Sequence, residues 1–286
     1  MYRSSMPGMR KLAVAVLVGS VGINSCDRLV DPPLPEDAEV FTPPAVFATW
    51  WQMTEACSGL TGSLSAVTWY KTNEVLRDPR TGDGLVGYWS APGNRIVMSS
   101  LFIRDGAAVR HEMLHALIRQ PGHPRSQFLG KCGGTVSCAS ACVADAGAYP
   151  IPPETPISVG SESIDITVDI VPQNPTSAQD DGFFTITVAV RNLSPHWATI
   201  APLSSGPGDF ETFRFEVSGP SGGMTGAEIG EDPSQKIFAP GETKRHVFDF
   251  VIGDDAFGRQ LPAGDYVVRG GYSPYWSQQR AFSVGP

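Results

Sequence analysis

The sequence predicts an α+β protein, in which a small domain built around one central helix is followed by an all-β sandwich. Three observations lead to this prediction. A run of good helix formers covers 105–120, between an N-capping residue and a Pro-Gly pair. A group of prolines at 150–156 then separates two regions of different character. Beyond the prolines, apolar and polar residues alternate in short runs that are typical of half-buried strands.

Composition sets the broad class of the protein. The chain has 286 residues, which is long enough for two domains. The formal net charge of -8 argues against a nucleic-acid partner. The high content of glycine (31) and proline (25) favours β-structure with many turns.

Residues 1–26 have the features of a lipoprotein-type signal peptide. Three basic residues precede an apolar run at 12–23, which is too short to span a bilayer comfortably. The run ends in Ile-Asn-Ser-Cys, which resembles a bacterial lipobox with an unusual Asn24. We expect Cys26 to become the lipidated N-terminus, so that the protein is exported and anchored to a membrane of the bacterial cell envelope. Ordinary secretion and an uncleaved anchor are the alternatives.

The segment between the signal peptide and the central helix has five expected parts. Residues 27–44 carry five prolines and several acids, which predicts an extended, solvated tether. Residues 45–57 are expected to form a helix whose aromatic residues pack into a core. A strand is expected at 66–71, and a loop at 78–87. Asn94 to Ser100 is expected to form a short strand directly before the central helix.

The central helix carries the pattern His-Glu-x-x-His at 111–115. His111 and His115 lie one turn apart on the same helix face, so both imidazoles can reach one metal ion. Glu112 lies about 100° further round the helix and can direct its carboxylate at a water on that ion. Asp105 is the expected N-cap, and Pro121 with Gly122 ends the helix.

A third imidazole follows the helix. His123 comes after the Pro-Gly break, so the chain can turn back under the helix and offer another nitrogen. Three protein ligands with one open position are typical of a catalytic zinc site, whereas structural zinc sites are closed by four ligands. We therefore expect Zn²⁺ bound by His111, His115 and His123. An acidic residue from elsewhere in place of His123 is the alternative.

The stretch from His111 to Phe128 places a Gly-His pair after the motif helix and an aromatic residue a few positions later. It resembles the zincin metallopeptidases, in particular the minimal SprT and WLM types, over residues 85–130. The resemblance implies that the three histidines are zinc ligands and that Glu112 is the general base in hydrolysis of a peptide or protein substrate. It also implies that the strand at 94–100 forms the sheet edge with which the substrate pairs.

Some points of this resemblance stay open. The metzincin pattern is not met, because no methionine follows the motif before Met224. Tyr88, Tyr149 and His196 are candidates for the donor that stabilises the oxyanion, and the sequence does not choose among them. A non-catalytic binding lipoprotein with a zincin fold is one alternative function. A structural envelope protein that carries the motif by chance is another.

The cysteines agree with export. Five cysteines are an odd number for an exported protein, and lipidation of Cys26 would leave an even set. The four candidates for two disulfides are Cys57, Cys132, Cys138 and Cys142. Three pairings are possible. A second zinc site formed by the last three of these cysteines is the alternative, although their spacings do not match C-x2-C zinc modules.

The second half of the chain is expected to be all-β. The first domain covers 45–149, a proline-rich linker covers 150–157, and the β domain covers 158–286. The alternating segments are 164–170, 184–190, 213–217, 248–252, 266–272 and 282–284. About seven strands in such a length favour a β-sandwich. The turns at 239–243 and 261–266 resemble those of bacterial immunoglobulin-like domains, a likeness that implies a fold more than an activity.

Overall fold

The computed structural model describes residues 32–147, 151–177, 182–200, 212–220, 222–229, 236–252, 261–272 and 274–286. The expected signal peptide, the lipidation candidate Cys26 and the oxyanion candidate Tyr149 lie outside the described residues. Residues 31–286 form one compact unit. Among the described residues, no helix is both long and apolar enough to span a membrane.

Helix α2 (Gly106–Ile118) is the central helix that the sequence predicts. It begins as expected, because the Asp105 side chain accepts a hydrogen bond from the backbone N–H of Ala108 at 3.0 Å. Val109 and Met113 are fully buried, and most of the helix is buried on all sides. The helix ends two residues earlier than expected, because Arg119 adopts the left-handed conformation with φ 59°.

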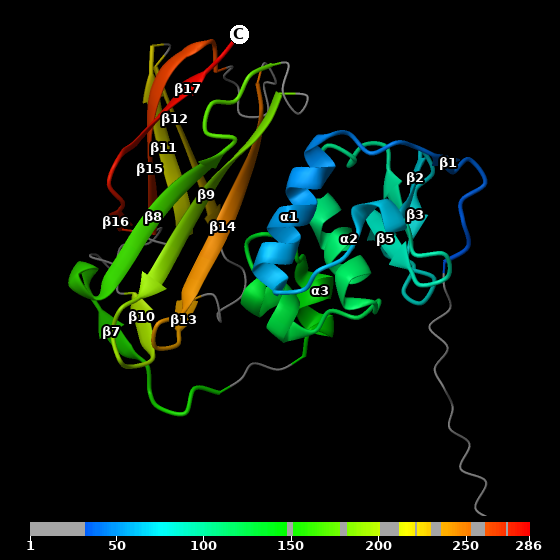
Figure 1. The fold of residues 1–286 in the computed structure, drawn as a ribbon. Helices are drawn as coiled ribbons and strands as arrows, with labels where there is room; N and C mark the ends of the chain where they lie inside the picture. The colour runs from blue at the N-terminus through cyan, green and yellow to red at the C-terminus, as the bar shows by residue number, and fades with distance from the viewer. Residues whose placement is uncertain are drawn as a thin grey trace, which may run out of the picture. The chain divides into compact units, whose positions relative to one another are not determined.

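The helices of the N-terminal half pack on one face of a four-stranded sheet (Figure 1). The sheet order is β1 (Glu39–Val40), β2 (Thr68–Thr72), β6 (Arg95–Ser99) and β5 (Gly87–Ser90). Helix α1 (Val46–Ser58) brings aromatic residues against the sheet, as predicted, and their core includes Phe47, Trp50, Trp51, Trp69 and Trp89. The α+β class is thus confirmed at the level of mixed helices and sheets.

The strand expected at 94–100 is present as β6, but its expected place at the sheet edge is wrong. Strand β6 lies between β2, which runs parallel to it, and β5, which runs antiparallel. Strand β5 is the edge because the chain forms a hairpin that adds it outside β6, with Trp89 opposite Ile96. The loop expected at 78–87 also contains β4 (Gly84–Leu85), which pairs with β3 (Leu76–Arg77).

Part of the expected tether is attached to this sheet. Strand β1 pairs with β2, and the Tyr88 hydroxyl donates to the carbonyl of Pro33 at 3.1 Å. Tyr88 packs with Val97 in a small cluster, whereas the alternating residue Trp89 faces the helices. Residues 32–40 therefore lie at the far edge and on the face of the sheet opposite α1 and α2.

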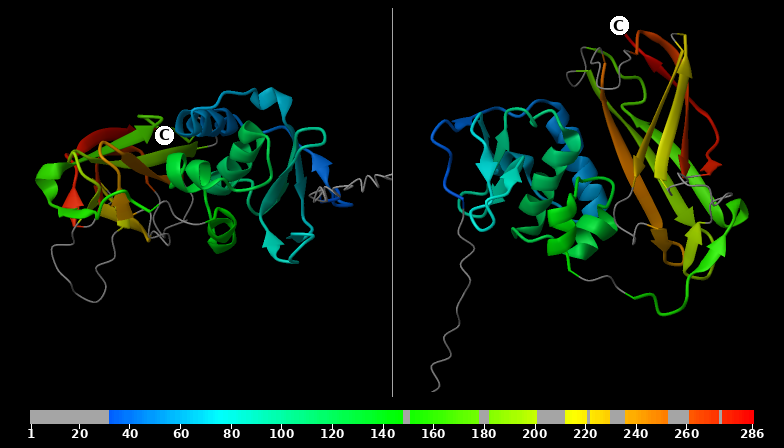
Figure 2. Two further views of the ribbon diagram at one scale, coloured as in Figure 1. Left: turned by 90° about the horizontal axis from the view of Figure 1, so that it is seen from below. Right: turned by 180° about the vertical axis from the view of Figure 1, so that it is seen from behind.

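Two sheets of the C-terminal half pack around one shared core (Figures 1 and 2). The first has the order β14 (Thr243–Val251), β9 (Phe183–Asn192) and β8 (Ile164–Val171). The second has the order β12 (Gly222–Ile229), β11 (Thr212–Gly219), β15 (Gly264–Tyr272) and β16 (Tyr275–Trp276), with β17 (Arg280–Val284) also on β15. Each predicted alternating segment falls in one of these strands.

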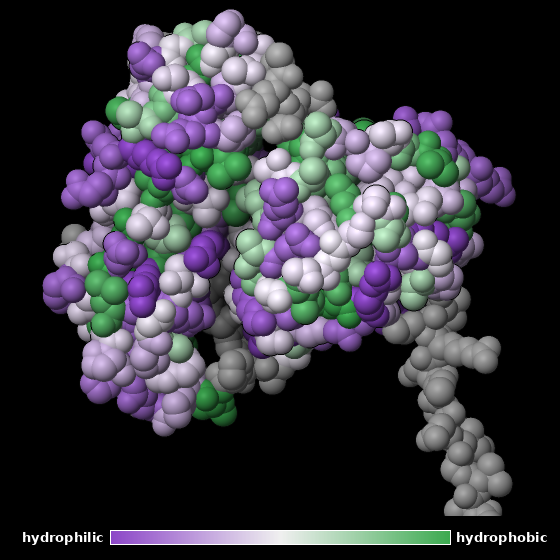
Figure 3. Space-filling view, in the orientation of Figure 1, coloured by the Kyte–Doolittle hydropathy of each residue, from purple (hydrophilic) through white to green (hydrophobic). Residues whose placement is uncertain are grey.

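Shorter elements complete the described part of the chain. A third sheet has the order β13 (Ile237–Phe238), β10 (Ala198–Ile200) and β7 (Ile157–Val159). After α2 come a π-helical segment (Ser126–Lys131) and helix α3 (Ser140–Asp145). Single 3-10 turns cover Leu64–Ala66 and Ser161–Ser163. Hydrophilic and hydrophobic residues are interspersed on the face seen in Figure 3, as expected for strands that alternate between core and solvent.

Candidate metal centre

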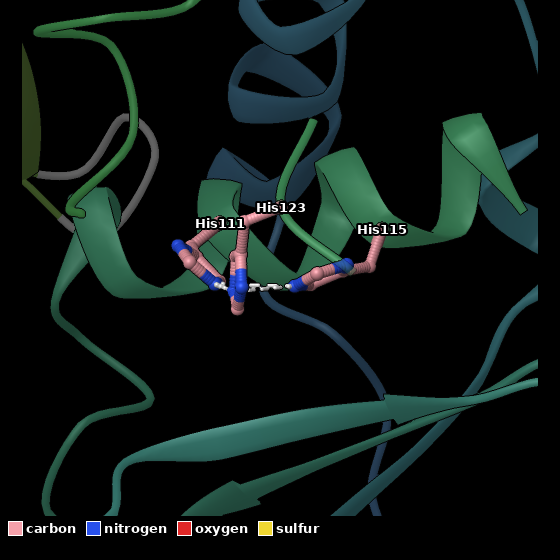
Figure 4. A group of neighbouring side chains, drawn as sticks. All are labelled: His111, His115 and His123. Atoms are coloured by element: carbon pink, nitrogen blue, oxygen red, sulfur yellow. Dashed lines mark hydrogen bonds between the residues drawn. The ribbon is translucent and has the colours of Figure 1, made fainter. Parts of the chain in front are cut away.

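Three imidazoles converge next to helix α2 (Figure 4). His111 and His115 come from successive turns of the helix, and His123 from the segment that follows it. The Nε2 atoms are separated by 3.1 Å for His111 and His123, 3.2 Å for His111 and His115, and 3.3 Å for His115 and His123. Within the described residues, this is the group of side chains that could hold a metal ion.

The spacing of the nitrogens fits a small tetrahedral ion. A Zn–N bond of about 2.0–2.1 Å places two ligands of a tetrahedral site about 3.3–3.4 Å apart. The three observed separations, 3.1 to 3.3 Å, come within a few tenths of an ångström of that value. Three nitrogens at one triangular face leave the fourth corner of the tetrahedron for a different ligand, which agrees with the predicted open position.

Hydrogen bonds on the opposite side of each ring fix its tautomer. The Nδ1 atom of His111 lies 2.5 Å from the carbonyl oxygen of Ser137, and that of His115 lies 2.9 Å from the carbonyl of Gln120. The Nδ1 atom of His123 lies 2.8 Å from Oδ2 of Asp145. Carbonyl and carboxylate oxygens only accept, so each Nδ1 carries the proton and each Nε2 presents a lone pair.

Burial keeps the rings of His111 and His115 neutral. Desolvation, with a smaller repulsion from His123, lowers the pKa of His111 to about 4. Desolvation also holds the pKa of His115 well below its usual value. At neutral pH neither of these two rings therefore has a proton to bridge the Nε2 atoms, and their lone pairs face each other at 3.2 Å. A cation at their centre removes this repulsion, so the donor set fits a metal.

Phe128 forms a floor for the three rings. Its side chain is fully buried, and its ring centroid lies 4.9 Å from that of His111 and 4.8 Å from those of His115 and His123. Phe128 is the aromatic residue that the sequence places after the Gly-His pair. Its contact restricts the rotation of all three imidazoles, which preorganises them for one shared ligand.

Glu112 lies on the same helix, facing the edge strand. Its side chain is only 4% exposed, and desolvation raises its pKa to about 8, against a lowering effect of a hydrogen bond with the backbone of Trp89. Among the described residues, its Oε2 atom has no hydrogen-bond partner. A side chain at Gly87 would come within 3.2 Å of Cγ of Glu112, so the two residues lie close together.

All four predicted cysteines form disulfides. The pairs are Cys57–Cys132 and Cys138–Cys142. The alternative of a second zinc site at Cys132, Cys138 and Cys142 is therefore wrong, because a disulfide sulfur has no thiolate to offer. The first pair ties α1 to the segment after the metal site, across a sequence separation of 75 residues.

The structure does not bring the two described oxyanion candidates to the imidazoles. The phenol of Tyr88 donates to Pro33 on the other face of the sheet. The imidazole of His196 is half exposed in the C-terminal half, 3.5 Å from the carboxylate of Glu154. Neither residue belongs to the described group of metal-ligating side chains.

Sequence reasoning missed the three acceptors that orient the rings. Two of them, at Ser137 and Gln120, are backbone carbonyls, which carry no side-chain signal. The third is Asp145, which lies 22 residues from His123 and belongs to no motif. The pairing of a metal-binding imidazole with an outer acceptor is a general feature that could have prompted a search for such residues.

Comparisons with known proteins leave the family open. No family model and no curated protein matches this chain. A structure of the DNA glycosylase AlkC from Pseudomonas fluorescens aligns over 62% of this chain and 39% of its own, with 8% identity and a TM-score of 0.31. A β-glucosidase from Listeria innocua aligns over 43% and 16%, with 14% identity and a TM-score of 0.27. Similarities this low carry no argument about the function of this chain.

Proposed function

We propose that this protein is an exported, lipid-anchored zinc metallopeptidase of the bacterial cell envelope. One observation supports the proposal above the others: three imidazoles direct their Nε2 atoms at one point, and Glu112, which follows His111 in the sequence, is buried with a carboxyl oxygen that has no partner among the described residues. Imidazole donors in a three-ligand set suit zinc, with an open position for chemistry. These are the roles that the resemblance of the motif to the zincin peptidases implies.

His111, His115 and His123 would hold the zinc, and Glu112 would handle the proton. When bound, zinc polarises a carbonyl group and lowers the pKa of water to about 7. The free Oε2 atom of Glu112 would accept the proton of the attacking water and deliver it to the leaving amine. A cation held by the neighbouring imidazoles favours the carboxylate form, so it would lower the pKa of Glu112 from the value that burial alone sets.

The edge strand β5 is the proposed docking site for the substrate. Its outer edge has no neighbouring strand among the described residues, so an extended peptide can add to it by main-chain hydrogen bonds. Two residues of this strand approach Glu112: a Cβ atom at Gly87 would lie 3.2 Å from its Cγ, and the backbone of Trp89 forms a hydrogen bond with it. A peptide bound along β5 would thus run past the carboxyl group.

The proposed location rests on two features. The N-terminal segment resembles a lipoprotein signal peptide that ends at Cys26. Both disulfides within the described chain agree with an oxidising compartment. Metabolic labelling with a radioactive fatty acid would test the anchor, with Cys26→Ser as the unlabelled control.

Metal analysis and a peptidase assay together test the proposed activity. We expect one zinc per chain and chelator-sensitive cleavage of a mixed peptide library. Glu112→Gln should retain the zinc and lose turnover, because the amide cannot take the proton. A chain that binds zinc but cleaves nothing would instead support the alternative of a non-catalytic binding protein. A chain that binds no zinc would refute both.

A further inference from the structure

One short segment supplies the outer acceptors for two of the three imidazoles. The carbonyl oxygen of Ser137 lies 2.5 Å from Nδ1 of His111. The carboxylate of Asp145 accepts from His123 twice, from Nδ1 at 2.8 Å and from the backbone N–H at 3.2 Å. The orientation of two ligands therefore depends on how residues 137–145 are held.

The same segment is closed by the disulfide between Cys138 and Cys142. Ser137 directly precedes the first cysteine, and Asp145 follows the second within the six-residue helix α3. A helix this short is not stable by itself in water. Cys142 is buried in a cluster with Leu114 of α2 and Phe128, so the disulfide joins the segment to the floor of the metal site.

Two further hydrogen bonds hold the ends of the segment. The backbone N–H of Ser137 donates to the carbonyl of Ala107 at 3.1 Å. At the other end, Nε of Arg125 donates to the carbonyl of Gly147 at 2.8 Å. Between these points, the disulfide is the covalent cross-link that restrains the backbone connecting the two acceptors.

We propose that the Cys138–Cys142 disulfide is a clasp that positions His111 and His123 for the metal, through Ser137 and Asp145. A metal-binding imidazole is oriented by the acceptor on its other nitrogen, and loss of such an acceptor typically weakens metal affinity about 10- to 100-fold. Without the disulfide, the backbone between Ser137 and Asp145 can change conformation. The clasp thus contributes to zinc affinity more than to the stability of the fold.

This inference rests on the metal-binding part of the proposed function and does not need peptidase activity. Zinc affinity of the full chain would be measured by competition with a chromophoric chelator, together with the melting temperature of the metal-free protein. We expect Cys138→Ser/Cys142→Ser to weaken zinc binding about 10-fold. The matched control, Cys57→Ser/Cys132→Ser, breaks a disulfide that supplies no acceptor. It should lower the melting temperature more and the zinc affinity less than two-fold.

Two further variants separate positioning from general loosening. Asp145→Ala removes the acceptor and should weaken zinc binding to a similar extent, whereas Asp145→Asn keeps an acceptor oxygen and should restore most of the affinity. When Asp145→Ala is combined with Cys138→Ser/Cys142→Ser, zinc affinity should fall by less than the product of the two separate fold-losses, because both changes act on His123.

The measured zinc affinities can overturn the proposed role of the Cys138–Cys142 disulfide. Affinity within two-fold of wild type in Cys138→Ser/Cys142→Ser, or fully multiplicative losses on adding Asp145→Ala, would overturn the clasp. If the cysteine variant does not fold, equal zinc affinity in Asp145→Ala and wild type would overturn it instead. Failure of the wild-type chain to bind zinc would be a different result, because it would refute the proposed function itself.

Discussion

Arg110 on α2 and Asp249 on β14 form a two-pronged ion pair that joins the helix carrying His111 and His115 to the C-terminal sheet. The two terminal guanidinium nitrogens each donate to one carboxylate oxygen at 2.8 Å. The remaining donor, Nε, bonds the carbonyl of Thr135 at 2.6 Å. The Arg110 side chain is fully buried, and that of Asp249 is 18% exposed. Because Arg110 directly precedes His111, this pair fixes the helix next to the first metal-binding imidazole.

Removing the carboxylate should strongly destabilise the protein. Asp249→Asn leaves a buried guanidinium without its counter-charge, which typically reduces the free energy of unfolding by about 3–5 kcal/mol. Chemical denaturation would measure the loss. The exposed pair between Lys71 and Glu39 is the matched control, and Glu39→Gln should change stability by less than about 1 kcal/mol.

The apolar double variant Arg110→Met/Asp249→Leu tests the cause of this loss. It removes both charges, so it should recover most of the stability lost in Asp249→Asn. A double variant as unstable as the single one would indicate that packing, and not the uncompensated charge, is responsible.

His246 should make stability depend on pH. Burial, with repulsion from Arg110, lowers its pKa from 6.5 to about 4 in the folded protein. The unfolded chain therefore binds a proton that the folded chain does not, between pH 6.5 and pH 4. The stability contribution of the neutral ring is full above pH 6.5 and is lost as the pH falls through 4, by up to about 3 kcal/mol.

His246→Phe isolates this effect. The ring packs against Phe213 and Phe248, so an aromatic replacement preserves the contacts. The variant should lose less unfolding free energy than wild type between pH 7 and pH 4, when both are measured without metal. Parallel pH profiles would show that His246 does not titrate in this range on unfolding.

Local sequence patterns predict the helix and the three histidines. They do not predict contacts between segments that are distant in the sequence. The i, i+4 spacing of His111 and His115 depends only on helix geometry. Arg110 and Asp249 are 139 residues apart, and neither shows in the sequence that it will be buried against the other. The contacts of the acceptors Ser137 and Asp145 with the imidazoles cannot be predicted from local sequence either, because only the folded chain brings them together.

Among the strands that sequence patterns did not predict, β5 and β12 were missed for different reasons. Strand β5 has only four residues, all buried, so no alternation between apolar and polar residues marks it. Strand β12 contains three glycines, at 222, 223 and 226, and Phe215 of β11 lies so close to Gly226 that a side chain there would collide with its ring. Alternation predicts a strand with one solvent face and one apolar face. Strand β5 has no solvent face, and glycines take the place of apolar residues in β12.

The Cys57–Cys132 disulfide should stabilise the fold more than the Cys138–Cys142 disulfide does. It closes a sequence separation of 75 residues, for which the chain-entropy model gives about 4 kcal/mol. Cys57→Ser/Cys132→Ser should therefore lower the free energy of unfolding by about that amount. Guanidinium denaturation of the metal-free protein would measure it. A loss no larger than that of Cys138→Ser/Cys142→Ser, whose loop is far shorter, would contradict the model.

Gly87 leaves room for Glu112, so adding a methyl group there should impair catalysis without affecting the metal. A Cβ atom at this position would lie 2.5 Å from Sδ of Met98, 3.1 Å from the carbonyl of Val97 and 3.2 Å from Cγ of Glu112. The flexible end of the Met98 side chain can move aside, but the Val97 carbonyl belongs to the paired sheet and cannot yield. The methyl group would therefore press on Cγ of Glu112 and shift the side chain that carries the carboxyl group. A misplacement of about 1 Å can cost a catalytic group on the order of 100-fold in rate.

Gly84→Ala is the control, because nothing lies within 4 Å of a Cβ atom there. We expect Gly87→Ala to reduce kcat at least about ten-fold with zinc affinity within two-fold of wild type, and Gly84→Ala to change neither. The three histidines that could hold the metal come from α2 and the segment after it, and none of them is among the nearest neighbours of a Cβ atom at Gly87. A Gly87→Ala enzyme that kept its kcat would therefore mean that the position of Glu112 does not set the rate.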